Sequence, residues 1–428
     1  MKRLGFVLAC GIALCSVTPA AAQTPKLVVI IVADQMRADY WIRFKPFLAK
    51  AGIRRFIDDG AYFPNAAYDY GATKTSPGHV LIGSGLYPNQ SGIIGNEWYD
   101  RSEKREVASA ELATDTSPPR LKWFIGRSFA QRFKQVYPQG RMVSLSIKDR
   151  AALLLTGPGQ DLVAWYDAAR GGFITLADCA TWVMSFNRTI APFADEHPRW
   201  VPMSELTNDI LKSYTVNLQS PPPVVVPGET FSHRAGLLSD IPTTPWGDML
   251  LEKLAESEVD AQHLGSNPTG SPDVLALSFS SIDLVGHPYG PDSPEIMDTF
   301  LRFDRDVESL LDFVESRVGK ENLLLAVSSD HGVTPIPEIS RAKGNPAIRV
   351  SLTKKSAPHP EWVEAVSPPY VYIDETAVHR AGLTTADAVR QEQAALRKLD
   401  GVQAVYNEDQ IIKGQAPADI ARAFFLGR

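Results

Sequence analysis

The chain contains four apolar, β-branched runs that each end on ionisable residues, and this pattern limits its fold more than any other feature. The run KLVVIIVA (26–33) stops at Asp34 and shows no polar alternation, which is typical of a parallel strand buried on both faces. The other runs end in the same way: VLALSFSSID at Asp283, NLLLAVSSDHG at Asp330 and His331, and RMVSLSIKDR at Lys148 and Arg150. Because the carboxyl ends of parallel strands lie at one edge of a sheet, we expect these side chains to converge there.

Helical stretches lie between these strands. Residues 294–319, PEIMDTFLRFDRDVESLLDFVESRVG, repeat apolar positions at three- and four-residue spacing, as an amphipathic helix does. Alternating strands and helices predict an α/β fold, here a three-layer α/β/α sandwich with a largely parallel central sheet. With 428 residues, 44% of them hydrophobic, the chain is long enough to bury a large core and to carry insertions.

The first 22 residues have the pattern of an export signal. Lys2 and Arg3 precede the apolar run LGFVLACGIALCSV, and the small residues of PAAAQ offer a cleavage site after Ala22. We therefore expect a periplasmic or secreted protein. No later segment approaches the ~20 apolar residues that a membrane helix needs, so no membrane span is expected in the mature chain.

Charge and cysteine content argue against a nucleic-acid partner and against an internal disulfide. The sequence has 43 basic against 49 acidic residues and no basic run, so a nucleic-acid partner is not expected. Cys10 and Cys15 lie in the predicted signal, which leaves Cys179 alone in the mature chain. No internal disulfide is therefore expected.

Two regions are expected to be additions to the sheet domain. Residues around 160–245 are rich in Trp and Pro, and SPPPVVVPG at 220–228 predicts an exposed loop or edge, so this region is interpreted as an inserted cap. Residues 350–412 predict a small β-α-β subdomain built from YVYID, the helix TTADAVRQEQAALRKLD and VQAVYN. The expected division of the chain is a signal peptide at 1–22, a catalytic α/β domain at 23–349, the subdomain at 350–412, and a return to the catalytic domain at 413–428.

Three carboxylates and two imidazoles are expected at the shared sheet edge: Asp34, Asp283, Asp330, His287 and His331. Oxygen and nitrogen ligands without a thiolate suit zinc, and manganese or magnesium less well. Three carboxylates placed together without cations would cost several kcal/mol through repulsion or forced protonation, so a metal centre is predicted. Five ligands exceed what one four-coordinate zinc usually binds. A pair of ions is therefore expected, which can act on both ends of a displacement reaction.

The stretch TKTSPGH (73–79) offers hydroxyl groups for such a reaction. A helix opened by Pro77 would place partial positive charge beside Thr75, which favours an oxyanion such as phosphate. The same hydroxyls could instead cap the helix, as Ser and Thr commonly do. Lys148 and Arg150 would add two fixed positive charges, able to hold the outer oxygens of a phosphoryl group, although a K-x-R pair usually faces solvent.

These motifs together resemble those of the alkaline phosphatase superfamily. They run in the family's order from about residue 25 to the end of the chain: IVADQMRADY (Asp34), TKTSPGH (Thr75), GIIGNEWYD (Asn96), SIKDR (Lys148, Arg150), SIDLVGH (Asp283, His287) and SSDHG (Asp330, His331). The branch they resemble contains exported bacterial alkaline phosphatases with a threonine nucleophile. This branch is related to the type I phosphodiesterase and nucleotide pyrophosphatase family.

The resemblance implies a role for each of these residues. Thr75 would attack phosphorus and form a phosphothreonine intermediate, and Asn96 would hold a phosphate oxygen through its amide. The implied zinc ligands are Asp34, Thr75, Asp330 and His331 for one ion, and Asp283 and His287 for the other. Lys148 and Arg150 match the pair that marks the phosphate-monoester branch, so small phosphate esters are the expected substrates.

One part of the family pattern is not matched. In the family, the second zinc takes a further histidine from a segment near the C-terminus, whereas this chain stops at ARAFFLGR. We therefore expect a truncated form with an incomplete second zinc site. His359 and His379 are the remaining late histidines, and neither lies in a matching motif.

The same motifs also bear on functions other than that of a zinc phosphomonoesterase. A phosphodiesterase or nucleotide pyrophosphatase would need Lys148 and Arg150 to point elsewhere, and a metal- or phosphate-binding protein without turnover would bind zinc but not hydrolyse esters. A sulfatase is not expected, because Thr75 cannot become formylglycine. A serine hydrolase at LIGSGLYP is not expected either, because Ile82 stands where G-x-S-x-G requires glycine.

Overall fold

A computed structural model describes residues 24–113, 115, 120–176, 181–214 and 231–428 of the chain. The predicted signal peptide, Cys179 and the segment 220–228 lie outside these ranges. Within them, no helix combines the length and apolar character needed to cross a membrane.

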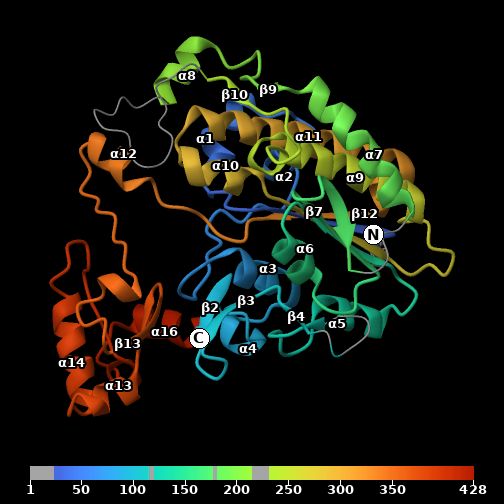
Figure 1. The fold of residues 1–428 in the computed structure, drawn as a ribbon. Helices are drawn as coiled ribbons and strands as arrows, with labels where there is room; N and C mark the ends of the chain where they lie inside the picture. Colours follow the sequence, from blue (N-terminus) through green and yellow to red (C-terminus); the bar gives the residue numbers. More distant parts are fainter. Residues whose placement is uncertain (1–23, 114, 116–119, 177–180, 215–230) are drawn as a thin grey trace, which may run out of the picture.

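A six-stranded sheet forms the centre of the molecule (Figure 1). All neighbours are parallel except the last two, which pair antiparallel. In spatial order the strands are β12 (Leu323–Ser328), β1 (Leu27–Ala33), β11 (Asp273–Phe279), β6 (Met142–Ser146), β7 (Leu162–Asp167) and β8 (Gly172–Thr175). The predicted α/β class with a largely parallel sheet is confirmed.

The strand β1 lies inside this sheet because its side chains are apolar on both faces. Its residues alternate between two cores: Leu27, Val29 and Ile31 pack in the largest core, whereas Val28, Ile30 and Val32 pack against smaller clusters on the other face. The strand pairs with β12 and β11, so that Val29 lies between Leu325 and Leu275. An uninterrupted apolar run thus fits a strand covered on both sides.

Helices cover both faces of the sheet, which gives the three predicted layers (Figure 1). The helices of one layer include α7 (Thr181–Glu196), α9 (Trp246–Gln262), α10 (Ser281–Tyr289) and α11 (Pro294–Val318), and those of the other include α3 (Thr75–Ser84), α5 (Phe129–Val136) and α6 (Asp149–Thr156). The helix α11 matches the predicted span 294–319 to within one residue. The Ser293 side chain caps its first turn, and Gly319 ends it.

Shorter elements complete this part of the chain. The helices are α1 (Tyr40–Arg43), α2 (Arg54–Asp58), α4 (Pro88–Ser91), α8 (Asn208–Tyr214) and α12 (Pro337–Ala342), with 3₁₀ turns η1 (Lys45–Phe47), η2 (Ile241–Thr243) and η3 (Lys320–Asn322). The strands are β2 (Glu97–Asp100) paired with β3 (Arg105–Ala108), β4 (Leu112–Ala113) with β5 (Arg120–Leu121), and β9 (Arg199–Trp200) with β10 (His233–Arg234).

The boundaries of the sheet differ from the sequence-based expectation. Residues 162–175 were expected in the inserted cap, but β7 and β8 extend the central sheet. The apolar run containing Asp283 is also shorter than expected: β11 ends at Phe279, and Asp283 lies in the first turn of α10. The turn SSID begins a helix because the Asp248 carboxylate accepts hydrogen bonds from the backbone N–H groups of Ser280 and Ser281, at 2.9 and 3.0 Å.

A separate C-terminal lobe follows the sheet domain (Figure 1). It contains the antiparallel pair β13 (Val363–Ser367) and β14 (Tyr370–Ile373), followed by α13 (Glu375–Arg380), α14 (Thr385–Leu396), α15 (Glu408–Ile412) and α16 (Ala418–Gly427), with η4 (Lys354–Ser356) before them.

The predicted β-α-β order of this lobe is wrong in its last strand. Residues 402–407 form no strand. The carbonyl oxygen of Val405 instead accepts hydrogen bonds from the side chains of Gln393 and Arg397, both at 2.6 Å, and Asn407 caps α15. These side-chain contacts occupy groups that a strand would use for pairing, and β14 pairs with β13 instead.

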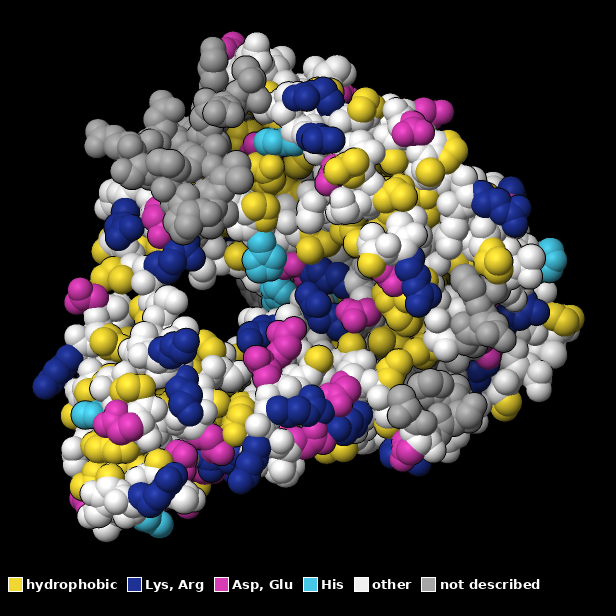
Figure 2. All heavy atoms as spheres, in the orientation of Figure 1, with side chains coloured by type: hydrophobic (Ala, Val, Ile, Leu, Met, Phe, Trp, Pro, Cys, Tyr) yellow, Lys and Arg dark blue, Asp and Glu magenta, His cyan; other side chains and the backbone are white. Residues whose placement is uncertain are grey.

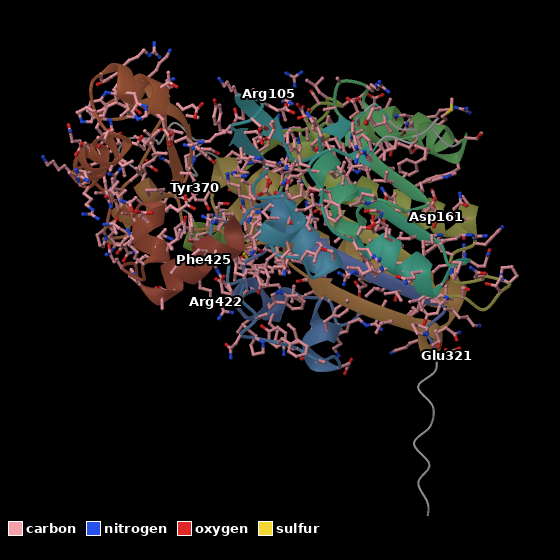
Figure 3. All side chains as sticks on the ribbon, turned by 90° about the horizontal axis from the view of Figure 1, so that it is seen from below. Arg105, Asp161, Glu321, Tyr370, Arg422 and Phe425 are labelled. Carbon is pink, nitrogen blue, oxygen red and sulfur yellow. The ribbon has the colours of Figure 1, made fainter. Side chains whose placement is uncertain are left out.

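The C-terminal lobe contacts the sheet domain through α16 and β13. The backbone N–H of Gly71 donates to the Ala423 carbonyl at 3.0 Å, and Arg422 forms an ion pair with Asp69 at 2.6 Å. Figure 3 labels Tyr370, Arg422 and Phe425 in this region, where α16 lies beside the loop that leads into α3. The loop that precedes the hydroxyl-rich stretch is therefore held by the last helix.

Candidate metal and phosphate site

The carboxyl ends of four neighbouring strands bring charged side chains together. Lys148, which follows β6, is buried, and its Nζ donates to Asp34 Oδ2 at 2.7 Å and to Asp283 Oδ2. Asp34 follows β1 and Asp283 lies just beyond β11, so three adjacent strands meet in this one network. The structure therefore brings these side chains together at one edge of the sheet, as the sequence predicts.

Three of the predicted metal ligands form a compact group. One ligand atom from each of Asp34, Asp283 and His331 lies within 4.8 Å of the others. His331 Nε2 lies 3.3 Å from Asp34 Oδ1 and 3.5 Å from Asp330 Oδ2. Within the described ranges, both of these oxygens are buried and accept no hydrogen bond of good geometry. Orphaned carboxylate oxygens beside an imidazole nitrogen are suited to a divalent cation such as zinc.

The electrostatics of this group favour positive charge. Burial alone would raise the pKa of Asp34, but the Lys148 ammonium and the His331 imidazole outweigh it and hold that pKa well below its usual range. Burial and the nearby Asp34 carboxylate raise the pKa of Asp330. Burial would lower the pKa of His331, but the Asp330 and Asp34 carboxylates raise it to about 9. Neighbouring cations thus favour the ionised form of Asp34, whereas burial and the Asp34 charge disfavour the ionised form of Asp330.

His287 lies beside the group rather than inside it. Its Nε2 is 3.3 Å from Asp283 Oδ1, and its side chain is 70% exposed. The two residues stand one turn apart on α10, which is why a spacing of four brings them together. The Asp283 carboxylate raises the pKa of His287. His287 therefore adds an imidazole nitrogen beside the buried Asp283 carboxylate, and the two groups are of the kinds that bind divalent cations.

The residue Thr75 begins α3 and is buried against the same edge. The His79 Nδ1 lies 2.8 Å from the Thr75 carbonyl oxygen and 3.3 Å from Asp330 Oδ2. A Cβ at Gly78 would lie 2.4 Å from the Asp330 backbone oxygen, so the first turn of α3 lies directly against that residue. The first turn of α3, which begins at Thr75, therefore lies beside Asp330, although the two are far apart in the sequence.

The two remaining predicted phosphate-binding side chains have groups that can donate to a ligand. The Asn96 Oδ1 accepts the Ser76 backbone N–H at 2.9 Å, which orients the amide and leaves its NH₂ group as the donor. The Arg150 Nε is buried and, among the residues that the structure describes, has no hydrogen-bond partner. Figure 2 shows a hollow between the C-terminal lobe and the sheet domain, with histidine, basic and acidic side chains on its wall.

A model of the type I phosphodiesterase / nucleotide pyrophosphatase family matches residues 28–419, nearly the whole described chain. The chain belongs to this family. Alkaline phosphatase PhoV of Synechococcus elongatus is 32% identical to this family member over 405 residues, which cover 90% of this chain and 72% of PhoV. A Myroides odoratus protein named calcium-transporting ATPase is 27% identical to this chain, and the matched region covers 92% of this chain and 77% of that protein.

The solved structures give the same result for the fold. Wild-type alkaline phosphatase PafA has a TM-score of 0.84 and 26% identity to this family member, and the match covers 96% of this chain and 84% of PafA. The likeness to PafA and PhoV confirms the resemblance to the alkaline phosphatase superfamily and the expected sandwich fold.

Sequence reasoning missed three residues of this phosphodiesterase-family site. Gln35 contacts both Asp283 and Asp330, His79 links Thr75 to Asp330, and the Tyr68 hydroxyl donates to the carbonyl oxygen of Ser329. The other ring nitrogen of His79, Nε2, lies 2.7 Å from Ser278 Oγ. The one available signal was position: Gln35 directly follows Asp34 at a strand end.

The two late histidines lie in the C-terminal lobe of this family member. His359 stacks on Trp362 with ring centroids 4.3 Å apart, and His379 lies in α13 near the Thr385 hydroxyl. Neither belongs to the metal group found among the described residues.

Proposed function

We propose that the chain is a zinc-dependent phosphate monoester hydrolase of the alkaline phosphatase type, with Thr75 as the nucleophile. The observation that carries the proposal is the position of Lys148, whose ammonium joins Asp34 to Asp283 at the sheet edge. Two of its three N–H donors are used there, so the third remains for a phosphate oxygen. The names of PhoV and PafA support the same chemistry.

Each site residue has a part in the proposed reaction. Asp34, Thr75, Asp330 and His331 would hold one zinc ion, and Asp283 and His287 the other. When bound, these ions would activate the nucleophile and stabilise the departing oxygen. Among the described residues, the buried donor Arg150 Nε has no partner, which supports a role in binding an outer phosphate oxygen. The Asn96 NH₂ group would bind another.

The reaction would proceed in two displacements at phosphorus. In the first, Thr75 Oγ loses its proton to solvent and bonds to phosphorus, while the ester P–O bond breaks and the leaving oxygen departs with the electron pair. In the second, a water oxygen bonds to phosphorus and the Thr75 Oγ–P bond breaks with its electron pair on Oγ. A proton from the water restores the threonine hydroxyl, and inorganic phosphate is released. The Lys148 and Arg150 cations stabilise the charge on the phosphoryl oxygens in both steps.

A second candidate, a phosphodiesterase, is favoured by the family description itself. In a diester the second ester group replaces one charged oxygen, so a cation pair would add little to binding. The predicted export signal places either enzyme in the periplasm or outside the cell, with small phosphate esters as substrates.

The test compares hydrolysis of an aryl phosphate monoester, the matching diester and ATP by the purified chain with excess zinc. We expect the monoester to be hydrolysed fastest. Arg150→Ala should lower the monoester kcat/KM by about 10²–10³-fold and change the diester rate by less than about tenfold. Arg317→Ala, which removes an exposed arginine paired with Asp260 at 2.8 Å, is the matched control.

Other outcomes would lead to other functions. A faster diester reaction that is insensitive to Arg150 would indicate the phosphodiesterase. Zinc binding by a folded chain without hydrolysis of any of the three substrates would indicate a binding protein without turnover.

A further inference from the structure

Gln35 occupies an unusual position at the end of β1. It is 2% exposed, and its φ of 65° lies in the left-handed region, which few residues other than glycine adopt. Such backbone conformations are energetically unfavourable, and they cluster at sites where the surrounding structure holds the residue for a function. The contacts of Gln35 indicate what that function is.

Gln35 contacts a carboxylate on each side of β1. Its backbone N–H donates to Asp330 Oδ1 at 3.0 Å, and its side-chain Nε2 donates to Asp283 Oδ1 at 2.6 Å. Asp330 follows β12 and Asp283 follows β11, the two strands that flank β1. One residue therefore connects carboxylates that the proposed function assigns to two different metal ions.

The amide of Gln35 occupies space that a side chain at position 286 would need. A Cβ at Gly286 would lie 2.2 Å from Gln35 Oε1. The nearest other side-chain atom outside Gln35, Ile296 Cδ1, would be 3.6 Å away, an ordinary contact. The helix α10 thus carries both the ligand Asp283 and the gap that admits the amide beside it.

The chemistry of an amide suits this place. Gln35 fixes Asp283 Oδ1 without adding a positive charge, whereas Lys148 contacts the other oxygen, Oδ2. A neutral donor orients a ligating carboxylate but does not compete electrostatically with a bound cation. Loss of such outer hydrogen bonds typically lowers metal affinity by about 10–100-fold.

We infer that Gln35 is a positioning residue that couples the two halves of the metal centre, and that Gly286 exists to seat it. The inference rests on the proposed zinc-dependent function. Because the bond to Asp330 comes from the backbone N–H, it does not depend on the Gln35 side chain, and only proline would remove the donor. The side-chain bond to Asp283 does not, so a change of side chain acts on one ion and spares the other.

The experiment measures zinc binding to the purified metal-free chain by chelator competition, and the thermal midpoint of the same samples. Gln35→Met keeps the length of the side chain but removes the amide. We expect one of two zinc sites to weaken by about 10–100-fold while the other is unchanged. Gln139→Met, at an exposed position remote from these contacts, is the control.

Gly286→Ala supplies an independent arm. Its methyl group should displace the Gln35 amide and weaken the same zinc site, with little change in the thermal midpoint, because a flexible side chain can move aside. In the double variant Gln35→Met/Gly286→Ala, the amide that the methyl group would displace is already absent. The two losses of zinc affinity should therefore not add.

Each result bears on the inference. Wild-type zinc affinities in Gln35→Met would overturn it, and so would additive losses in the double variant. Equal weakening of both zinc sites together with a large fall in the thermal midpoint would indicate a general role in folding and would also overturn it. A wild-type chain that binds no zinc would overturn the proposed function itself, which separates that failure from this one.

Discussion

At the scale of single residues, the site depends on which of three nearby hydroxyl groups lies at the sheet edge. Thr73, Thr75 and Ser76 are adjacent in TKTSPGH, yet Thr73 is exposed while Thr75 and Ser76 are buried. The Ser76 hydroxyl pairs with Ser109 Oγ at 2.7 Å, and its backbone N–H binds Asn96. Thr75 is therefore a buried residue in the first turn of α3 whose hydroxyl makes no such bond among the described residues.

Replacing Thr75 tests its role as nucleophile. Thr75→Ala should lower kcat for the aryl monoester by roughly 10³-fold or more, because no other hydroxyl can form the covalent intermediate, whereas Thr75→Ser should keep measurable activity. The control Thr73→Ala should retain wild-type kcat. Mass spectrometry of acid-quenched enzyme should find phosphate on Thr75. Turnover by Thr75→Ala close to wild type would assign the nucleophile elsewhere.

Glu258 in α9 is a buried acid outside the site. It is fully buried, and neither carboxyl oxygen has a hydrogen-bond partner among the described residues. Burial raises the pKa of Glu258 to about 8, and the Arg141 cation offsets this only in part. An unfolded chain releases that proton near pH 4.3. The folded state therefore holds a proton that the unfolded state has lost, and stability falls as pH rises between these two values.

Substitution of Glu258 should remove this loss. At pH 9, Glu258→Gln should have a higher free energy of unfolding than the wild type and should unfold at a higher denaturant concentration. At pH 4 both states of the wild type are largely protonated, so the difference in free energy of unfolding should be smaller by a few kcal/mol. Urea unfolding at the two pH values measures the difference. Parallel pH profiles for the two proteins would show that Glu258 ionises normally.

At the scale of elements, α3 is held between α6 and the strand ends by close backbone approaches. A Cβ at Gly83 would lie 1.8 Å from the Leu155 carbonyl oxygen in α6, and one at Gly78 would lie 2.4 Å from the Asp330 oxygen. Backbone atoms cannot move aside as a flexible side chain can. The helix that carries Thr75 can therefore approach both neighbours only because these two positions are glycine.

Gly83→Ala should destabilise the folded chain by about 1–3 kcal/mol or more, because the added methyl group forces α3 away from α6. Denaturant unfolding measures the change. Gly71→Ala is the matched control, since its Cβ would meet Ala423 O at an ordinary 3.5 Å. A Gly83→Ala protein as stable as the Gly71→Ala protein would contradict the tight α3–α6 contact.

At the scale of the whole molecule, the proposed metal centre joins segments from both halves of the chain. Asp34, Asp283 and Asp330 are buried, and each follows one of three strands that pair only after folding. Because the unfolded chain lacks a preformed site, metal binding adds to the free energy of unfolding.

Zinc removal should therefore lower the thermal midpoint of the whole protein. Zinc at a thousand times its dissociation constant would stabilise a single site by about 4 kcal/mol, and chelator should reverse this. The effect should weaken in acid, because carboxylate and imidazole ligands must be deprotonated. Calorimetry with zinc and with chelator measures it. A midpoint unchanged by either addition would argue against a structural contribution from the ion.

Much of this molecule follows from the sequence because burial leaves a local pattern. The apolar run 26–33 became β1, the spacing in 294–319 became α11, and each of the four runs led to an ionisable residue near the same sheet edge. Strand direction and periodicity are properties of neighbouring residues, so they can be predicted from short stretches.

The tertiary structure decided the contacts that no local pattern records. Gln35 gains its importance from Asp283, Asp330 and Gly286, which lie about 250 to 295 residues away. The segment 402–407 has the composition of a strand, but the side chains of Gln393 and Arg397 bind the Val405 carbonyl oxygen and the segment forms no strand. A pairing or positioning role depends on which distant groups arrive at the same place, and that is settled only when the whole chain packs.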